Sequence, residues 1–216
     1  SGNSADAHGG GIYWGDNASP SLENVVISGN SGNDGGGVYC EGGSPTFQDV
    51  IISDNSGLHA GGLYITGNSN PNFENIAIID NYGSGNAGGV NIQNSDGVVL
   101  QNALISGNTA PYGAGGIFIN GEPSIVNNTI FNNSGTWGIN IASSVIQNCI
   151  IWDNSGSEGA IFSDDDTYNI TYSDIEGGWE GTGNIDSDPL FCNADSSDFT
   201  LYDNSPCVGT GQDGAN

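Results

Sequence analysis

Two histidines and one aspartate recur at one position of a repeat in this 216-residue sequence. His8, Asp34 and His59 each lie three residues before the end of a Gly-Gly pair, and Asn86 occupies that position at the next pair. If the repeats stack, these side chains lie along one edge at about the spacing of neighbouring strands. Two imidazoles and a carboxylate are suitable ligands for Zn²⁺ or another transition metal. The alternative is a solvated turn in which His and Asp only hydrogen-bond.

A pair of carboxylates aligns in the same way. Asp54 and Asp80 occupy equivalent positions of adjacent repeats. Stacked carboxylates either raise the pKa of one member or share a cation, so the pair predicts Ca²⁺ binding. Paired carboxylates also hydrolyse glycosidic bonds, which leaves acid/base hydrolysis as a second interpretation. The acidic run at residues 164–166 is expected to be a solvated loop, with a Ca²⁺ ligand cluster as its alternative.

The charge of the chain excludes several classes of partner. There are no Lys or Arg residues against 25 Asp and Glu, which gives a formal net charge of -25. Nucleic-acid binding through phosphate neutralisation needs basic residues and is therefore excluded. Such a surface repels anionic membranes and glycans and attracts cations, Ca²⁺ among them. The alternative is solubility in a salty medium, where screening acts within ~8 Å. No apolar run approaches 18 residues, so no membrane span is expected.

These residues recur because the whole sequence repeats about every 25 residues. The repeats align on five Gly-Gly pairs, at residues 10–11, 36–37, 61–62, 88–89 and 115–116. Each pair precedes an apolar-aromatic run, a turn rich in Gly, Ser and Asn, and then an isoleucine-rich run. Repeats of this length are typical of stacked structural units. One isoleucine recurs in every repeat, at Ile27, Ile52, Ile78, Ile105, Ile130 and Ile151.

The repeat predicts an all-β fold, a parallel β-helix with three short strands per coil of about 25 residues. We expect coils over residues 1–175 and a closing segment of the same domain over residues 176–216. Two ladders of Asn and Asp mark the turns, where stacked amides hydrogen-bond along the stack and tolerate a left-handed backbone. One ladder is Asn24, Asp49, Asn75, Asn102, Asn127 and Asn148, and the other is Asn3, Asn30, Asn55, Asn81, Asn108, Asn133 and Asn154.

Two outward-facing columns are candidate binding surfaces. The first consists of Tyr13, Tyr39, Tyr64 and Phe118, with Asn91 between the last two. Its aromatic rings could stack on the sugar rings of a neutral glycan. The second column consists of Val26, Ile51, Leu104 and Ile150. It forms a partly apolar stripe that could bury a lateral partner, and the alternative is ordinary surface apolarity.

The pattern changes from Ile170 onward. The segments are Tyr-Ser-Asp-Ile-Glu-Gly at 172–177, Asn-Ile-Asp-Ser-Asp-Pro-Leu-Phe at 184–191, Asp-Phe-Thr-Leu at 198–201 and Ser-Pro-Cys at 205–207. They resemble the closing segment of secreted bacterial right-handed parallel β-helix repeat proteins. The Gly-Gly-apolar phrasing of the coils is also similar to chlamydial polymorphic outer-membrane proteins, which are adhesins. The resemblance implies export and a right-handed β-helix, but it implies no single activity, because this fold also hosts polysaccharide lyases and hydrolases.

If the protein is exported, its four cysteines could form disulfides. Cys192 and Cys207 lie fifteen residues apart in the closing segment. A disulfide between them would stabilise the fold by about 3 kcal/mol and suits an exported protein. Cys40 falls in an inward-facing column and is expected to be a buried free thiol. Cys149 lies several coils away, beyond the reach of a disulfide with Cys40.

The leading hypothesis is an exported, non-catalytic β-solenoid at the cell surface. It would be a structural, adhesive or filament-forming subunit that requires no cofactor and whose assembly Ca²⁺ could support. Its partners would be other copies or a cell-surface ligand, because the first coil is open and exposes unpaired strand edges. Residues 1–3 align with residues 28–30, which predicts a piece of a longer precursor. The alternative is a carbohydrate-binding or neutral-glycan hydrolase-like protein. A lyase of this fold is disfavoured, because such lyases use Arg or Lys.

Overall fold

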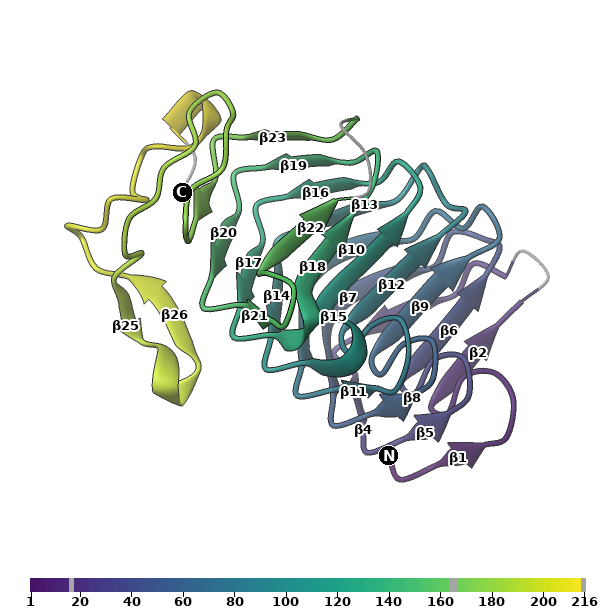
Figure 1. Ribbon diagram of the computed structural model, residues 1–216. Coiled ribbons are helices and arrows are strands. Elements are labelled where there is room, and N and C mark those ends of the chain that lie inside the picture. The colour runs from purple at the N-terminus through teal and green to yellow at the C-terminus, as the bar shows by residue number, and fades with distance from the viewer. Residues whose placement is uncertain (16–17, 164–166, 215–216) are drawn as a thin grey trace.

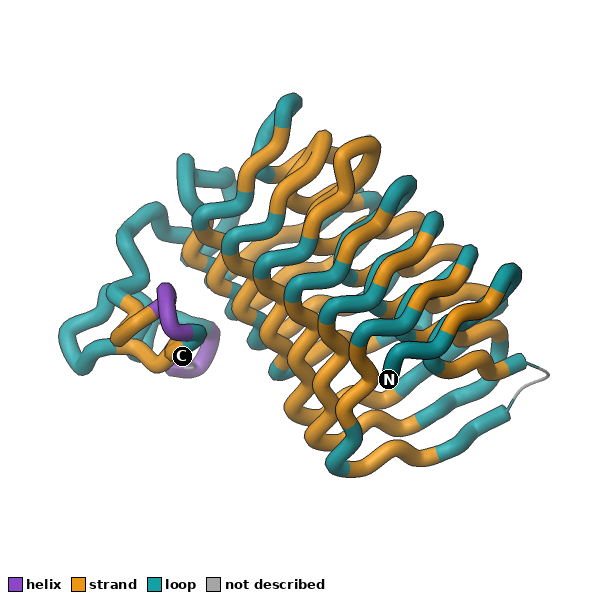
Figure 2. The backbone as a smooth tube through the Cα atoms, turned by 90° about the horizontal axis from the view of Figure 1, so that it is seen from below, coloured by secondary structure: helices purple, strands orange, loops and turns teal. Residues whose placement is uncertain are grey.

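The chain winds into a stack of coils whose strands pair in parallel from one coil to the next (Figure 1). The computed structural model describes residues 1–15, 18–163 and 167–214. Tyr39 pairs with Tyr64 and Ile52 pairs with Ile78, so these coils take 25 and 26 residues, and the others range from 21 (Ile130 to Ile151) to 27 (Tyr64 to Asn91). Figure 2 shows the coils as successive turns of one tube, with the C-terminal segment at one end of the stack. The predicted all-β parallel β-helix is confirmed.

One sheet contains four strands that follow Gly-Gly pairs, a fifth strand that contains such a pair, and two later strands without one. In chain order they are β2 (Ile12–Trp14), β6 (Val38–Glu41), β9 (Leu63–Thr66), β12 (Val90–Gln93), β15 (Thr109–Asn120), β18 (Ser134–Ile141) and β22 (Ile161–Ser163). The same sheet contains two-residue strands that the sequence did not predict. They are β1 (Ser4–Ala5), β5 (Ser31–Gly32), β8 (Ser56–Gly57), β11 (Tyr82–Gly83) and β21 (Ser155–Gly156).

The second sheet bends around a corner and so supplies two sides of each coil. Its first side consists of β3 (Ser21–Glu23), β7 (Thr46–Ser53), β10 (Asn72–Ile79), β13 (Val99–Gln101), β16 (Ser124–Val126), β19 (Val145–Gln147) and β23 (Asn169–Thr171). Its second side consists of β4 (Val26–Ser28), the later halves of β7 and β10, β14 (Ala103–Ser106), β17 (Thr129–Phe131), β20 (Ile150–Trp152) and β24 (Asp174–Ile175).

The Gly-Gly pairs recur because the backbone is crowded where they lie. A Cβ atom on Gly36 would lie 2.4 Å from the carbonyl oxygen of Ser56 and 2.5 Å from that of Gly61. Contacts below 3 Å with backbone atoms leave no room for a side chain, so glycine is required there. The same crowding recurs on the next coil, where a Cβ atom on Gly61 would lie 2.5 Å from the carbonyl oxygen of Gly88.

The core is a column of stacked apolar side chains. The repeated isoleucines are all buried, with Ile52, Ile78 and Ile105 at 0 % exposure. Phe47 and Phe73 stack on adjacent coils with ring centroids 5.0 Å apart. Burial of apolar surface stabilises the fold by roughly 25 cal/mol per Å², so the inward alternation of these residues drives the coiling.

The two asparagine ladders have different roles. The ladder from Asn24 to Asn148 lies at the corner of the second sheet, and all its members have a left-handed backbone, with φ between 50° and 56°. The ladder that contains Asn30 is buried from Asn30 to Asn154 and hydrogen-bonded from coil to coil. The left-handed residue at that corner is the one before it, for example Asp54 (φ 55°) or Asn132 (φ 51°). Asn, Asp and Gly recur at both corners because other residues are strained there.

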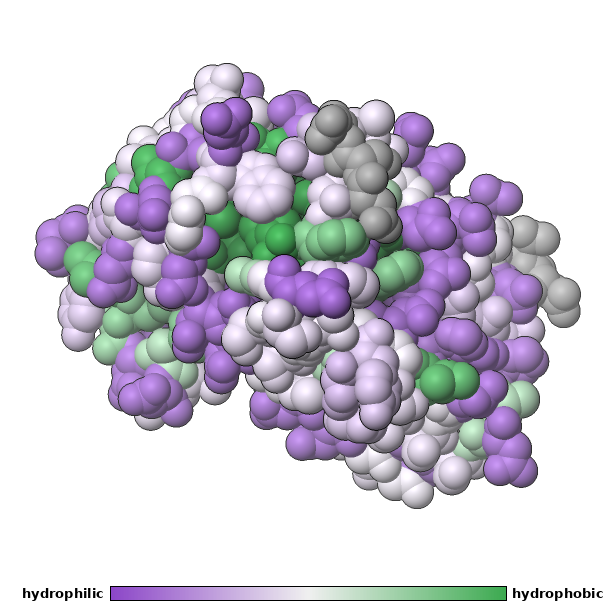
Figure 3. Space-filling view, viewed as in Figure 1, coloured by the Kyte–Doolittle hydropathy of each residue, from purple (hydrophilic) through white to green (hydrophobic). Residues whose placement is uncertain are grey.

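The closing segment covers the last coil on the side of the second sheet. The backbone N–H of Tyr172 donates to the carbonyl of Thr182 at 2.8 Å, and that of Ile175 donates to Ile185 at 2.9 Å. Trp179 packs against the core. Figure 3 shows hydrophobic side chains gathered near the last coils and the closing segment, on a surface that is otherwise mostly hydrophilic.

A hairpin then lies against the outside of the coils (Figure 1). It consists of β25 (Phe191–Asn193), the 3-10 helix η1 (Ala194–Ser196) and β26 (Asp198–Leu201), and η2 (Gln212–Gly214) follows near the C-terminus. The two hairpin strands pair antiparallel. In the described part of the chain, no helix is long and apolar enough to cross a membrane.

The predicted disulfide between Cys192 and Cys207 is wrong. All four cysteines lie in the described part of the chain, and each is a free thiol. The Cys207 thiol donates to Oδ2 of Asp174 at 2.9 Å, beneath the closing segment, whereas Cys192 lies on the hairpin strand β25. Cys40 is a fully buried free thiol, as predicted.

Candidate functional site

The structure brings the two histidines and Asp34 together on the first coils. Nδ1 of His8 lies 2.8 Å from Oδ2 of Asp34, and Nε2 of His59 lies 3.8 Å from Oδ1 of the same carboxylate. Asp34 therefore sits between the two imidazoles, as the repeat alignment predicted. Among the described residues, however, no group of three or more His, Cys, Asp or Glu could hold a metal ion. What the geometry shows here is a carboxylate between two histidines.

The aromatic column predicted to stack on glycans is packed against these histidines. The ring of His8 stacks on Tyr13 and Tyr39, with centroids 4.7 and 5.4 Å apart. Tyr39 is only 7 % exposed, and burial together with the charges of Glu41 and Asp34 raises its pKa. Tyr13 is 46 % exposed. The centre of the column therefore offers almost no free ring face to a sugar.

The far end of this column is interrupted. Asn91 pairs with Tyr64 on one side and with Phe118 on the other. Its side chain is fully buried and donates to the carbonyl of His59 at 2.9 Å. A continuous aromatic platform for glycan stacking therefore does not form along these four coils.

Asp54 and Asp80 lie on adjacent coils at one corner, as predicted. Both are exposed and both have a left-handed backbone, with φ of 55° and 54°. Partial burial and the charge of Asp54 raise the pKa of Asp80. The two carboxylates therefore repel each other in the folded chain, and any shared cation would relieve that repulsion. The acidic run at residues 164–166 lies outside the described residues.

A more extensive surface is formed by the second side of the bent sheet, from β4 to β20. Its outward-facing residues form one column in strict register, Val26, Ile51, Ala77, Leu104, Thr129 and Ile150. We call this surface the β4–β20 face. Val26 is 59 % exposed and Ile51 is 40 % exposed, whereas Leu104 and Ile150 are half-buried. The predicted apolar stripe is therefore present, and its exposure falls along the stack.

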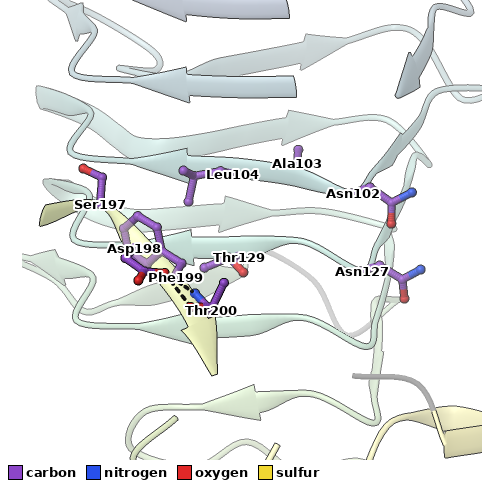
Figure 4. Close-up of a pocket in the computed structure, with 9 residues that line it drawn as sticks. All are labelled: Asn102, Ala103, Leu104, Asn127, Thr129, Ser197, Asp198, Phe199 and Thr200. Atoms are coloured by element: carbon purple, nitrogen blue, oxygen red, sulfur yellow. Dashed lines mark hydrogen bonds between the residues drawn. The ribbon is translucent and has the colours of Figure 1, made fainter. Parts of the chain in front are cut away.

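The hairpin β25–β26 covers the C-terminal part of this face. The ring of Phe131 packs edge-on against Phe191 and Phe199, with centroids 5.6 and 5.2 Å apart. A cavity of about 540 Å³ lies between β26 and the face (Figure 4). It is lined by Asn102, Ala103, Leu104, Asn127, Thr129, Ser197, Asp198, Phe199 and Thr200.

A second cavity of about 510 Å³ lies on the other side of β26, against Ile150 and Val208. It shares Thr129, Phe199 and Thr200 with the first cavity. Strand β26 therefore separates the two cavities. Both cavities have the β4–β20 face as their base.

The position at which the hairpin docks was not predicted from the sequence. A signal was present in the outward column next to the stripe. Its first members are Ser28, Ser53, Ile79 and Ser106, and the next two coils carry Phe131 and Trp152 there. The replacement of serine by large aromatic residues marks where another element covers the sheet.

Comparison with known proteins agrees with this architecture. The family model described as right handed beta helix region matches residues 1–144, two thirds of the chain. No curated protein and no solved structure matches the chain. With the parallel coils described above, the match places this chain in the right-handed β-helix family.

Proposed function

We propose that this chain is an exported, non-catalytic β-solenoid that serves as a rigid structural or adhesive unit at the cell surface. The β-helix provides the shaft, since each coil pairs with the next on all its sides. Export is supported by the resemblance of the closing segment to secreted β-helix proteins. The acidic surface, with a net charge of -25, suits a salty extracellular medium.

The observation that carries this proposal is the open edge of the first coil. Within the described residues, β1, β2, β3 and β4 each pair on one side only, with β5, β6 and β7. An unpaired parallel edge exposes backbone N–H and C=O groups that template the addition of further strands. The edge accepts another coil, whether it comes from the same polypeptide or from another copy.

The buried asparagine ladder reaches this edge as well. Asn3 donates its backbone N–H and its side-chain amide to Oδ1 of Asn30, both at 3.0 Å. Its own Oδ1 occupies the position that would accept the same pair of bonds from one more coil. The last coil differs, because the closing segment covers part of it. Within the described residues, the strands and the ladder of the first coil can therefore accept a further coil.

Hydrogen exchange over a range of protein concentrations tests this proposal. Amides of residues 21–28 on the open edge should become protected as concentration rises, because stacked coils pair with them. Amides of residues 169–175, beneath the closing segment, serve as the internal control and should not change. Equal exchange of the edge amides at all concentrations, with a monomeric mass by sedimentation, would contradict assembly through this edge.

Ca²⁺ is proposed as an aid to this assembly. Two chains of net charge -25 repel each other, and the pair Asp54 and Asp80 concentrates negative charge on one corner. A divalent cation at such corners would reduce the repulsion between neighbouring shafts. The mass of the assembly should then fall when a chelator is added and recover with excess Ca²⁺.

A further inference from the structure

The β4–β20 face has one covered part and one bare part. The hairpin β25–β26 covers the coils that contain Thr129 and Ile150, where Phe131 contacts two hairpin phenylalanines. Towards the N-terminus the column continues from Leu104, at the edge of the cavity beside the hairpin, to Ile51 and Val26, which are 40 % and 59 % exposed. The hairpin shows that an extended segment with apolar side chains fits this face.

The bare part is bordered by carboxylates on both sides. Along the bend of the sheet lie Glu23, Asp49 and Glu74, all exposed. At the opposite border lie Asp54 and Asp80, also exposed. An apolar strip between two acidic rows is complementary to a segment whose apolar residues are flanked by cationic ones.

The geometry points to the bare part of the β4–β20 face as a docking surface for an extended protein segment that alternates apolar and basic residues. From Val26 to Leu104 the column advances three coil spacings, about 14 Å. Four to five extended residues span that length at about 3.3 Å each. The occupant is therefore a short strand-like segment of a partner.

The composition of the chain argues that this partner is not a second copy. Without a single Lys or Arg, the chain cannot supply the cationic side chains that the acidic borders demand. Two such faces brought together would place carboxylates opposite carboxylates, and like charges at an interface are unfavourable. The basic residues must come from outside these 216 residues.

The cavity of about 540 Å³ lies where the bare part meets the hairpin (Figure 4). Leu104 forms its apolar base, Phe199 projects from β26, and the Asp198 carboxylate lies beside them. The amide and hydroxyl of Thr200 hydrogen-bond to Asp198, which lowers the pKa of its carboxyl and keeps it ionised. This end of the surface can therefore accept a large apolar side chain beside a basic one.

Fluorescence anisotropy with a labelled eight-residue peptide of alternating Leu and Lys tests the inference. Control peptides alternate Ser and Lys, or Leu and Glu. At near-physiological salt we expect the Leu-Lys peptide to bind at least tenfold more tightly than either control. Equal binding of the Ser-Lys peptide would mean that charge alone attracts it, and no binding of the Leu-Lys peptide would also overturn the proposal.

Matched variants locate the site. The double substitution Val26→Ser with Ile51→Ser should weaken Leu-Lys binding at least tenfold. The control is Val99→Ser with Val145→Ser, since both valines are 42 % exposed on the neighbouring side of the same sheet. The control pair should leave the affinity unchanged. A similar loss in both pairs would contradict the assignment.

Two further measurements distinguish the contribution of the acidic border to peptide binding from pairing between copies of the chain. Glu23→Gln with Glu74→Gln should weaken binding and reduce its dependence on salt, whereas Glu122→Gln with Glu158→Gln should not. Sedimentation of the peptide-free chain should give the same mass for the wild type and the Val26→Ser, Ile51→Ser variant. A lower mass for that variant would mean that the face pairs copies of the chain and would refute a basic partner.

Discussion

Asn55 donates its side-chain amide to Oδ1 of Asn81, 3.0 Å away on the next coil, and its backbone N–H reaches the same oxygen at 3.0 Å. Asn81 repeats both bonds to Asn108, and its amide also donates to the carbonyl of Ile52. Asn55 and Asn81 are each 1 % exposed. The ladder thus satisfies buried backbone groups at a corner where regular strand pairing stops.

Replacement of one member of the ladder should therefore be costly. Asn81→Ala leaves the two donors of Asn55 and the carbonyl of Ile52 without their partner. Each buried unsatisfied group costs roughly 1–3 kcal/mol, so we expect a loss of at least about 3 kcal/mol in the free energy of unfolding. Urea denaturation measures it. Asn72→Ala, at an exposed position of the preceding strand β10, is the control and should stay within about 0.5 kcal/mol of the wild type.

At the left-handed corners, by contrast, one substitution of asparagine should be tolerated. Asn132 has φ of 51° and is exposed. Asn132→Gly should leave the melting temperature unchanged or raise it, because glycine adopts this conformation freely. Asn132→Val should lower stability by about 1–2 kcal/mol, since a β-branched residue is strained there. Equal melting temperatures for the two variants would show that the corner does not impose this backbone.

The alignment of repeats predicted the fold because each coil places the same residue types at equivalent positions of the core and the corners. Isoleucines at a fixed interval face inward, and Gly, Asn and Asp appear where the backbone is crowded or left-handed. The two-residue strands were missed because two residues are too few to show an alternating pattern, and three of the five strands are Ser-Gly pairs with neither β-branched nor aromatic residues. The docking of the hairpin was missed for a different reason. Phe199 and Phe131 are 68 residues apart in sequence, and no periodic pattern connects them.

The side-chain site was predictable in part for the same reasons. Stacking fixes which residues are neighbours, so the proximity of His8 to Asp34 follows from the repeat. It does not fix how rings orient. The burial of Tyr39 beneath His8 and Tyr13 and the failure of the Cys192–Cys207 disulfide depend on packing that the period does not encode.

Acid should affect the Asp54–Asp80 corner in a predictable direction. The pKa of Asp80 is raised in the folded chain, so folding favours its protonated form. The associated stability is fully present below the unfolded pKa, near ~4, and is lost as pH rises through the raised folded value. Asp80→Asn should therefore raise the melting temperature at pH 7 but not at pH 3.

Screening by solvent limits the stability gained by Asp80→Asn. Asp80 is exposed, so screening should keep the gain to a few tenths of a kcal/mol. Differential scanning calorimetry at both pH values measures it, with Asp195→Asn as an exposed control on the hairpin. A gain that is the same at pH 3 and pH 7 would argue against charge repulsion as its cause.

The thiols should differ sharply in reactivity. Burial raises the pKa of Cys149 to about 11, and burial and the Asp174 carboxylate raise that of Cys207 to about 12. Thiolates are the reactive species, so iodoacetamide should label only the half-buried Cys192 in the native chain. In urea all four cysteines should react. Two unreactive cysteines in urea without a reductant would show that a disulfide does form.

Electron microscopy of the purified chain, with Ca²⁺ and with a chelator, tests the central claim most directly. A single unit should be a rod about 35 Å long, from seven coils at about 4.8 Å each. If the open edge of the first coil extends the shaft, longer rods should appear in Ca²⁺ and shorten in chelator. Single rods of one unit length at every concentration and in both conditions would contradict a structural role through that edge.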